Sequence, residues 1–110
     1  METKTKAETF IGFSVRAGKC RVGVNAVSTL KRVELIIVCK TASRNTASDA
    51  LSLSKRFGCK IIRTTEKPLQ DYVHRENAKV VAITDKALSK AIINNLEKDF
   101  IELNQENLNG

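Results

Sequence analysis

The chain has 110 residues, of which 42% are apolar, 28% charged and 5% aromatic. This composition is typical of one globular domain with an aliphatic core and argues against a disordered chain. No apolar run approaches the ~20 residues that a membrane span needs, and the charged residues 1–9 precede no long apolar segment of the secretory type. We expect a cytoplasmic protein with one domain over residues 1–102 and a polar tail over residues 103–110 that frays.

The positive charge of the chain lies in its first half. Nineteen Lys and Arg against 12 Asp and Glu give a net charge of +7. Residues 1–60 hold 12 basic and 4 acidic side chains, whereas residues 61–110 hold 7 and 8. Such a concentrated surplus favours a polyanion as partner, with nucleic acid as the first candidate. The alternative is a basic surface without a partner.

The first predicted element is a helix over residues 4–17. Its apolar side chains recur at helical spacing, so we expect one stripe to face the core. Gly18 suits the C-terminal end of this helix, and residues 20–22 then form a short extended piece. Gly23 separates that piece from a second helix, which we expect to run through Arg32. The stripe of the first helix consists of Phe10, Phe13 and Ala17.

The rest of the chain alternates strands with helices. Residues 35–39 and 80–83 are continuous apolar runs, which is typical of strands covered on both faces. A further strand is expected over residues 59–62. The alternation predicts an α/β fold, a three-layer α/β/α sandwich with a mainly parallel or mixed sheet of about four strands. Residues that mark helix ends in this order are Gly58, Thr64, Thr65, Pro68, Thr84 and Asp85.

No catalytic or metal-binding constellation can be assembled from the sequence. The single histidine, His74, has no partners at ligand spacing, and Asp85 is most simply a helix cap. Cys20, Cys39 and Cys59 form no CxxC pair and are expected to be free thiols. We expect no catalytic residue, no metal and no cofactor. A small hydrolase or transferase that uses Asp85 or His74 is the alternative.

Two segments of the first half suit contacts with RNA. Residues 19–25 run from a basic extended piece into a helix start, where free peptide N–H groups and the helix dipole can hold an anion. Gly23 lets an RNA backbone approach. Asn25 can donate to and accept from a base edge, unless it merely caps the helix. Residues 41–46 follow a strand, at the end where ligands favour an open α/β sheet, although they also suit a helix cap. The expected RNA-binding residues, which should share one face, are Lys19, Arg21, Gly23, Asn25, Lys31, Lys40 and Arg44.

Five segments in a fixed order carry a family resemblance, namely residues 11–19, 23–25, 35–38, 42–46 and 79–86. Together they extend over roughly residues 8–95. The set resembles the kink-turn-binding ribosomal protein family of the archaeal large-subunit protein seven-Ae and its thirty-e relative, and is most similar to the small bacterial members. The resemblance implies an α/β/α sandwich and a non-catalytic, ribosome-associated protein that binds a kink-turn or similarly structured RNA.

The resemblance also implies where the RNA site lies. Family members carry Gly-x-Asn-Glu at the start of the second helix and a Leu-Gly-x-Ala-x-Gly loop before the last strand. Gly23, Asn25 and Leu69 match these motifs. We expect the protein to be a monomer when it is not bound to RNA. Because other positions depart from the motifs, binding to a standard kink-turn should be weaker. A protein-interaction module whose RNA site has decayed is the alternative function. The departures are Ala26, Gln70, Tyr72 and His74.

Overall fold

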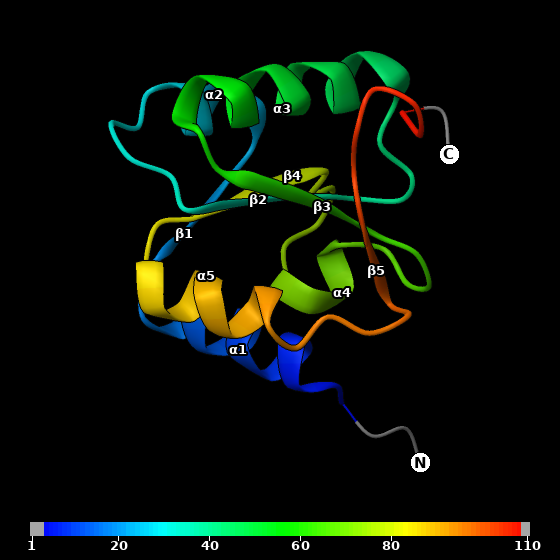
Figure 1. The fold of residues 1–110 in the computed structure, drawn as a ribbon. Coiled ribbons are helices and arrows are strands. Elements are labelled where there is room, and N and C mark those ends of the chain that lie inside the picture. Colours follow the sequence, from blue (N-terminus) through cyan, green and yellow to red (C-terminus); the bar gives the residue numbers. More distant parts are fainter. Residues whose placement is uncertain (1–3, 109–110) are drawn as a thin grey trace.

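The computed structural model describes residues 4–108 and is shown in Figure 1. Within these residues the chain forms five helices and five strands. No helix in this part of the chain is both long enough and apolar enough to cross a membrane. In chain order the elements are α1 (Lys6–Arg16), β1 (Cys20–Val22), α2 (Val24–Ser28), β2 (Leu35–Val38), α3 (Arg44–Phe57), β3 (Lys60–Thr64), α4 (Gln70–Val73), β4 (Val80–Ile83), α5 (Lys86–Ile93) and β5 (Phe100–Glu102).

The strands form one mixed sheet in the order β1-β4-β2-β3-β5. Only β2 and β3 pair in parallel, and the other three pairs are antiparallel. The predicted α/β sandwich with a mixed sheet is confirmed, but the sheet has five strands instead of about four and is not mainly parallel. Strand β5 is the added strand and makes one antiparallel pair, and the direction of β4 accounts for the other two. The short α4 does not carry the chain back across the sheet after β3. Strand β4 therefore starts at the end of the sheet where β3 stops, and it runs antiparallel to β2.

Helices cover both faces of the sheet. Figure 1 shows α1, α4 and α5 on one face and α2 and α3 on the other. Two apolar clusters fill the spaces between the layers, one built around Ile11, Ile37 and Ile83, the other around Ile36 and Leu51. All four residues of β2 and of β4 are buried, which confirms the prediction from their continuous apolar runs.

Helix α1 turns a different side to the core than the sequence predicts. Ala7, Ile11 and Ser14 are buried, whereas Phe13 is 44% exposed. The small Ala7 and Ser14 let α1 pack closely on its neighbours. The Ser14 hydroxyl donates to the Phe10 carbonyl at 3.0 Å, so its burial leaves no unpaired hydrogen-bond donor. The predicted stripe through Phe13 is therefore wrong. The prediction chose the largest apolar side chains, whereas the buried side of α1 carries small residues that let the helix lie close to its neighbours.

Helix α2 is shorter than expected. It ends at Ser28 and does not reach Arg32. The hydroxyls of Ser28 and Thr29 donate to the carbonyls of Asn25 and Ala26 at 2.7 and 2.8 Å, and so complete the bonding of this single turn. Capping of other helices is confirmed, since the Asp85 carboxylate accepts from the Leu88 N–H at 2.8 Å at the start of α5.

Threonine caps at the start of α4 are not observed. Thr64 belongs to β3, and the Thr65 hydroxyl donates to the Lys98 carbonyl. Helix α4 begins at Gln70 without a side-chain cap. Leu69, Tyr72 and Val73 are nevertheless buried as predicted.

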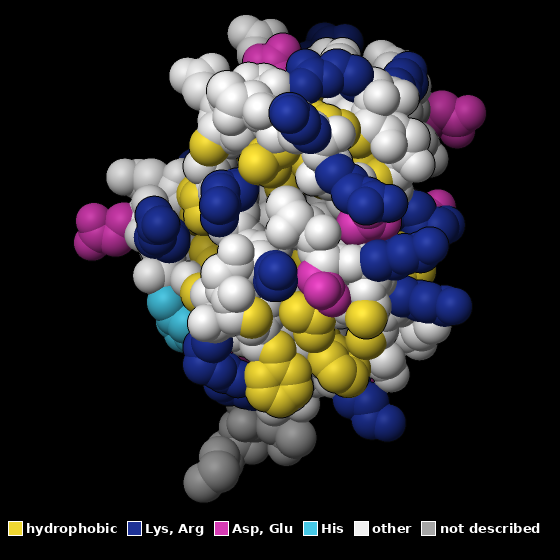
Figure 2. Space-filling model, turned by 90° about the vertical axis from the view of Figure 1, so that its left-hand side faces the viewer, with side chains coloured by type: hydrophobic (Ala, Val, Ile, Leu, Met, Phe, Trp, Pro, Cys, Tyr) yellow, Lys and Arg dark blue, Asp and Glu magenta, His cyan; other side chains and the backbone are white. Residues whose placement is uncertain are grey.

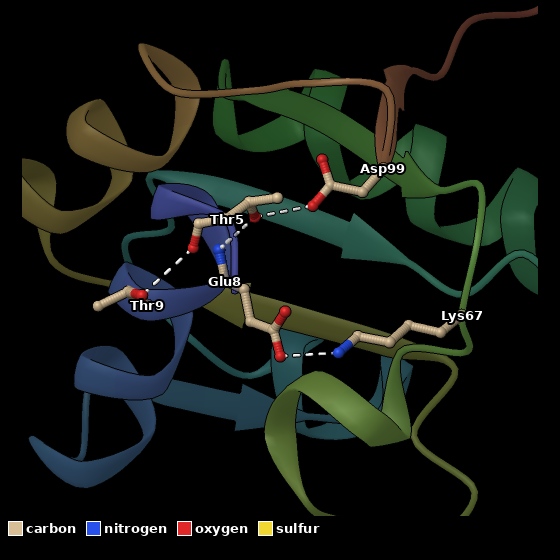
Figure 3. A network of polar contacts seen from close by, with 5 residues as sticks. All are labelled: Thr5, Glu8, Thr9, Lys67 and Asp99. Carbon is tan, nitrogen blue, oxygen red and sulfur yellow. Dashed lines mark hydrogen bonds and ion pairs between the residues drawn. The ribbon is translucent and has the colours of Figure 1, made fainter. Parts of the chain in front are cut away.

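Polar contacts join the two ends of the chain (Figure 3). The Thr5 hydroxyl accepts from the Glu8 N–H at 3.2 Å and donates to the Asp99 carboxylate at 2.8 Å. Lys67 forms an ion pair with Glu8 at 2.7 Å, which ties α1 to the segment before α4. These contacts hold the beginning of α1 between α4 and the approach to β5.

The C-terminal tail packs on the domain and does not fray within the described residues. Leu103 and Leu108 are 4% and 6% exposed and belong to the cluster beneath α3. The backbone N–H of Leu103 donates to the Ile61 carbonyl at 3.1 Å, which continues the pairing of β5 with β3. Residues 1–3 of the expected domain and residues 109–110 of the expected tail lie outside the described part of the chain.

Candidate nucleic-acid interface

Three chain segments meet where β4 begins. Strand β4 lies between β1 and β2, so the ends of those two strands flank Val80. The Gly23 N–H donates to the Val80 carbonyl and the Cys39 N–H donates to the Lys79 carbonyl, each at 2.8 Å. We call this region the β4-entry edge and define it as residues 23–25, 40–44 and 74–79. It brings together Gly23, Asn25, Lys40 and Arg44 of the predicted set.

Gly23 makes the turn from β1 into α2. Its φ of 100° and ψ of 142° lie in a region that residues with a side chain rarely adopt. A Cβ at this position would meet nothing within 4 Å. The glycine is therefore required by the backbone angle, and the space in front of it is open to a ligand.

The Asn25 side chain lies exposed on the first turn of α2. Gly23 occupies the N-cap position and no side chain caps the helix, so the alternative that Asn25 is a cap is wrong. No hydrogen bond joins its side-chain amide to another residue within 4–108. The amide is free to pair with an external donor and acceptor. The expected contribution of a helix dipole is small, because α2 has only five residues.

Lysines and arginines line the β4-entry edge from two of its segments. The ammonium group of Lys79 donates to the Thr41 hydroxyl at 2.6 Å, and that of Lys40 donates to the Glu66 carbonyl at 3.0 Å. Arg44 begins α3 and is exposed, since Ser43 supplies the helix cap by accepting from the Thr46 N–H at 3.1 Å. Basic side chains outnumber acidic ones in the three segments, where Glu76 is the one acidic residue.

Sequence reasoning missed Arg75 and Lys79. Both belong to the second half of the chain, whose near-neutral total hides their local grouping. Arg75 is exposed in the loop before β4. Arg21 is exposed on the edge strand β1, where its guanidinium donates to the Cys20 carbonyl at 3.2 Å. The one sequence feature that could have indicated this grouping is that Lys79 directly precedes the apolar run of β4.

Lys19 and Lys31 do not join this surface, which corrects the expectation of a single face. The Lys19 carbonyl accepts from the Thr84 N–H at 2.9 Å, which places Lys19 where β4 ends. Lys31 lines a cavity of about 420 Å³ together with Arg56 and Lys60, next to the beginning of β3. Figure 2 views this opposite end of the sheet and shows Lys and Arg side chains over much of it.

The loop before β4 contains two non-glycine residues in the left-handed region. His74 has a φ of 57° and Asn77 a φ of 59°. The Gln70 side-chain oxygen accepts from the Asn77 N–H at 3.2 Å and supports the loop. His74 stands where the resembling family carries glycine, so the glycine-like backbone is retained while an exposed imidazole is added. His74 and Gln70 are both exposed.

Cys39 lies directly beneath the β4-entry edge. Its sulfur lies 3.1 Å from the Thr41 hydroxyl and accepts from the Leu69 N–H at 3.3 Å. Burial raises the pKa of the Cys39 thiol, but the hydrogen bonds with Thr41 and Leu69 and the charge of Lys79 outweigh this effect, so the pKa is lowered. At the other two cysteines, Cys20 and Cys59, burial dominates and raises the thiol pKa to about 11.

The candidate catalytic residues are not assembled into a reactive site. Asp85 is occupied as the cap of α5, and His74 is exposed on the loop before β4. No group of three or more His, Cys, Asp and Glu side chains within residues 4–108 is arranged to hold a metal ion. A cavity of about 500 Å³ is lined by Glu8, Tyr72 and Asp99 among others, but Figure 3 shows Glu8 paired with Lys67 and Asp99 with Thr5.

Comparison with known proteins supports the fold without assigning a family. No family model matches the chain, and no curated protein matches it. A solved structure of a protein with unknown function from Bacillus halodurans C is similar, with a TM-score of 0.71 and 19% sequence identity. The similarity covers 83% of this chain and 96% of that protein. At this identity the likeness shows the α/β fold alone.

Proposed function

We propose that this chain is a non-catalytic RNA-binding protein of the cytoplasm, that it recognises a structured, kink-turn-like RNA of the ribosome or a related particle, and that it belongs to the ribosomal family it resembles. The observation that carries the proposal is the β4-entry edge. There a glycine turn, a free asparagine amide and basic loops from distant parts of the sequence meet around the start of one strand.

The proposed contacts divide into two kinds. Lys40, Arg44 and Lys79 are placed to neutralise phosphates, which supply affinity without sequence information. The Asn25 amide can pair with a base edge, and the open space at Gly23 admits the sugar-phosphate backbone. Loops of this kind suit bent or unpaired RNA, because the major groove of an A-form helix is too narrow for side chains.

The residues at the motif positions favour binding that is weaker than that of an intact family site. Ala26 is exposed beside Asn25 and offers no carboxylate to a guanine edge. Gln70 and His74 add exposed side chains to the segment before β4, whose first residue, Val80, accepts from the Gly23 N–H. The backbone path is nevertheless compatible with glycine at position 74, since φ there is positive.

The test is a titration of the full chain against a kink-turn RNA and a plain duplex of equal length, each at two salt concentrations. We expect tighter binding to the kink-turn and a steep loss of affinity with salt. Asn25→Ala should weaken kink-turn binding by about 1–3 kcal/mol and leave duplex binding nearly unchanged. Asn94→Ala is the matched control, because Asn94 is exposed at the end of α5.

Two outcomes contradict the proposal. Equal affinity for both RNAs would leave only nonspecific attraction to charge. Absence of binding to either RNA at low salt would favour the alternative, a protein-interaction module on the same fold.

A further inference from the structure

The outer surfaces of α1 and α5 carry a second feature, at the opposite end of the sheet from the β4-entry edge. The Thr84 N–H donates to the Lys19 carbonyl at 2.9 Å and holds the end of α1 beside the start of α5. Figure 2 shows an apolar area in its lower part, over these helix ends. We call it the α1–α5 patch. Its residues, each half-buried or exposed, are Phe10, Phe13, Ala17, Ala87, Leu88 and Ala91.

At single positions on these helices, polar side chains are buried and an aromatic side chain is exposed. Ser14 and Ser89 are 0% and 2% exposed beneath the helices, while Phe13 is 44% exposed on the outside. The Phe13 ring packs edge to face on Phe10, with centroids 6.0 Å apart. The exposed part of the Phe13 ring is apolar surface that the free chain leaves in contact with water. Contiguous exposed apolar surface of this kind marks an interaction site.

The charges around the patch indicate the chemistry of its partner. Arg16, Lys19, Lys86 and Lys90 are all exposed around it. The Arg16 guanidinium lies 5.0 Å from the centroid of the Phe13 ring, so cation and apolar surface are adjacent. The nearby carboxylate of Asp85 already accepts from the Leu88 N–H. A second copy of this chain would bring the same positive rim against itself, which is unfavourable.

We propose that the α1–α5 patch docks an acidic amphipathic helix of a partner protein. Apolar side chains of that helix cover Phe10 and Phe13, and its carboxylates pair with Arg16 and the lysines of α5, in the manner of a helix laid across a hydrophobic surface. The inference goes beyond RNA binding and does not depend on it. Because the two surfaces lie at opposite ends of the sheet, one molecule can hold both partners at once.

The experiment uses the isotope-labelled full chain and a synthetic peptide as probe. The peptide is an amphipathic helix of about 18 residues, long enough to form in water, with Leu on one face and Glu on the other. A control peptide carries Lys in place of every Glu. We expect backbone amide shifts confined to residues 10–17 and 86–91 with the Glu peptide, and none with the Lys peptide.

Variants make the assignment specific. Phe13→Ala should weaken binding of the Glu peptide about tenfold, as expected for an aromatic residue at the centre of an interface, and Lys90→Glu should also weaken it. Ile101→Ala is the matched control, because Ile101 is 37% exposed on β5 and lies outside the patch. The melting temperature of Phe13→Ala, measured beside that of Ile101→Ala, separates a loss of binding from a loss of folding, since the Phe13 ring also packs on Phe10.

Three outcomes overturn the inference. Equal binding of the Lys peptide would remove the charge argument. Binding of phosphatidylserine vesicles that depends on Phe13, without binding of the Glu peptide, would assign the patch to a membrane surface. Shifts at residues 10–17 and 86–91 on addition of kink-turn RNA, again without peptide binding, would assign it to nucleic acid.

Discussion

The two ends of the sheet are both basic, yet they are built differently. At the β4-entry edge the chain turns through positive φ angles at Gly23, His74 and Asn77, and the Asn25 side chain is exposed. At the opposite end the ends of α1 and α5 lie side by side, and Figure 2 shows an apolar area with Lys and Arg side chains near it. Positive charge alone therefore does not locate a nucleic-acid site. Backbone conformation and the side chains between the charges distinguish the two ends.

The cysteines show the same contrast in another property. Beneath the β4-entry edge, hydrogen bonds with Thr41 and Leu69 help to lower the pKa of the Cys39 thiol despite burial. Away from that edge, burial raises the pKa of Cys20 and Cys59 to about 11. The difference lies in the groups around each sulfur, since the Leu69 N–H and the charge of Lys79 favour the thiolate at Cys39, whereas burial outweighs the other influences at Cys20 and Cys59.

The largest expected effect concerns the turn at Gly23. Gly23→Asn should lower the free energy of unfolding by about 1–3 kcal/mol, because a φ of 100° with a ψ of 142° is strained for any side chain. Gly58→Asn is the matched control. Gly58 has a φ of 65° and a ψ of 34°, a left-handed conformation that asparagine tolerates. Urea unfolding followed by circular dichroism measures both, and equal losses would show that the turn at Gly23 is not special.

Charge removal at the two ends tests which of them binds RNA. The double variant Lys40→Gln, Arg44→Gln should reduce the slope of log affinity against log salt by about two, one for each phosphate contact. The double variant Lys19→Gln, Lys31→Gln removes the same charge from the opposite end and should leave the slope unchanged. Filter binding of the kink-turn RNA over a range of salt gives both slopes. Equal reductions would mean that RNA binding follows net charge alone.

A smaller effect is expected at the loop before β4. His74→Gly should raise the free energy of unfolding by about 0.5–1 kcal/mol, because it relieves a side chain held at a φ of 57°. It should also tighten kink-turn binding by removing an exposed imidazole from the edge. Glu76 in the same loop has no positive φ. Glu76→Gly should therefore lower the free energy of unfolding, because glycine only adds freedom to the unfolded chain there. If both glycine variants are destabilising to the same extent, the left-handed conformation at position 74 is not strained.

A loss of stability is also expected in alkali. Unfolded cysteines ionise near their ordinary pKa of 9.0, whereas folded Cys20 and Cys59 ionise at about 11. Their contribution to the free energy of unfolding is therefore full below pH 9 and is lost as the pH rises towards 11. The double variant Cys20→Ser, Cys59→Ser should show a shallower decline in urea midpoint over this interval. Tyr72, whose pKa burial also raises, is present in both proteins, so the difference isolates the thiols.

The sequence predicted those features of the fold that depend on residues close together in the chain. The apolar runs of β2 and β4, the Gly58 end of α3 and the Asp85 cap of α5 are confirmed, because each depends on neighbouring residues. The exposed side of α1, the reversed β4 and the added β5 were not predictable in this way. They depend on contacts between distant segments, such as Thr5 with Asp99.

The candidate site was predicted only in part for the same reason. Gly23 and Asn25 are close in sequence and were found together, and Lys40 and Arg44 follow one strand end. The grouping of Lys79 with Thr41 requires β4 to lie beside β2, which no local pattern indicates. The expectation that Lys19 and Lys31 share a face with Gly23 is wrong, because proximity in sequence does not show at which end of the sheet a connection emerges.

The position of β4 also determines the order in which the sheet can be completed while the polypeptide is being made. Strands β2 and β3 are joined through α3 and can pair once residue 64 is available. Strand β1 is synthesised before either of them, yet the strand it pairs with among the described residues is β4, about sixty residues later. Until Ile83 emerges, β1 lacks its partner strand in the sheet, and α1 lacks the α5 helix that lies beside it. The N-terminal segment is thus the part of a nascent chain most exposed to chaperones and proteases.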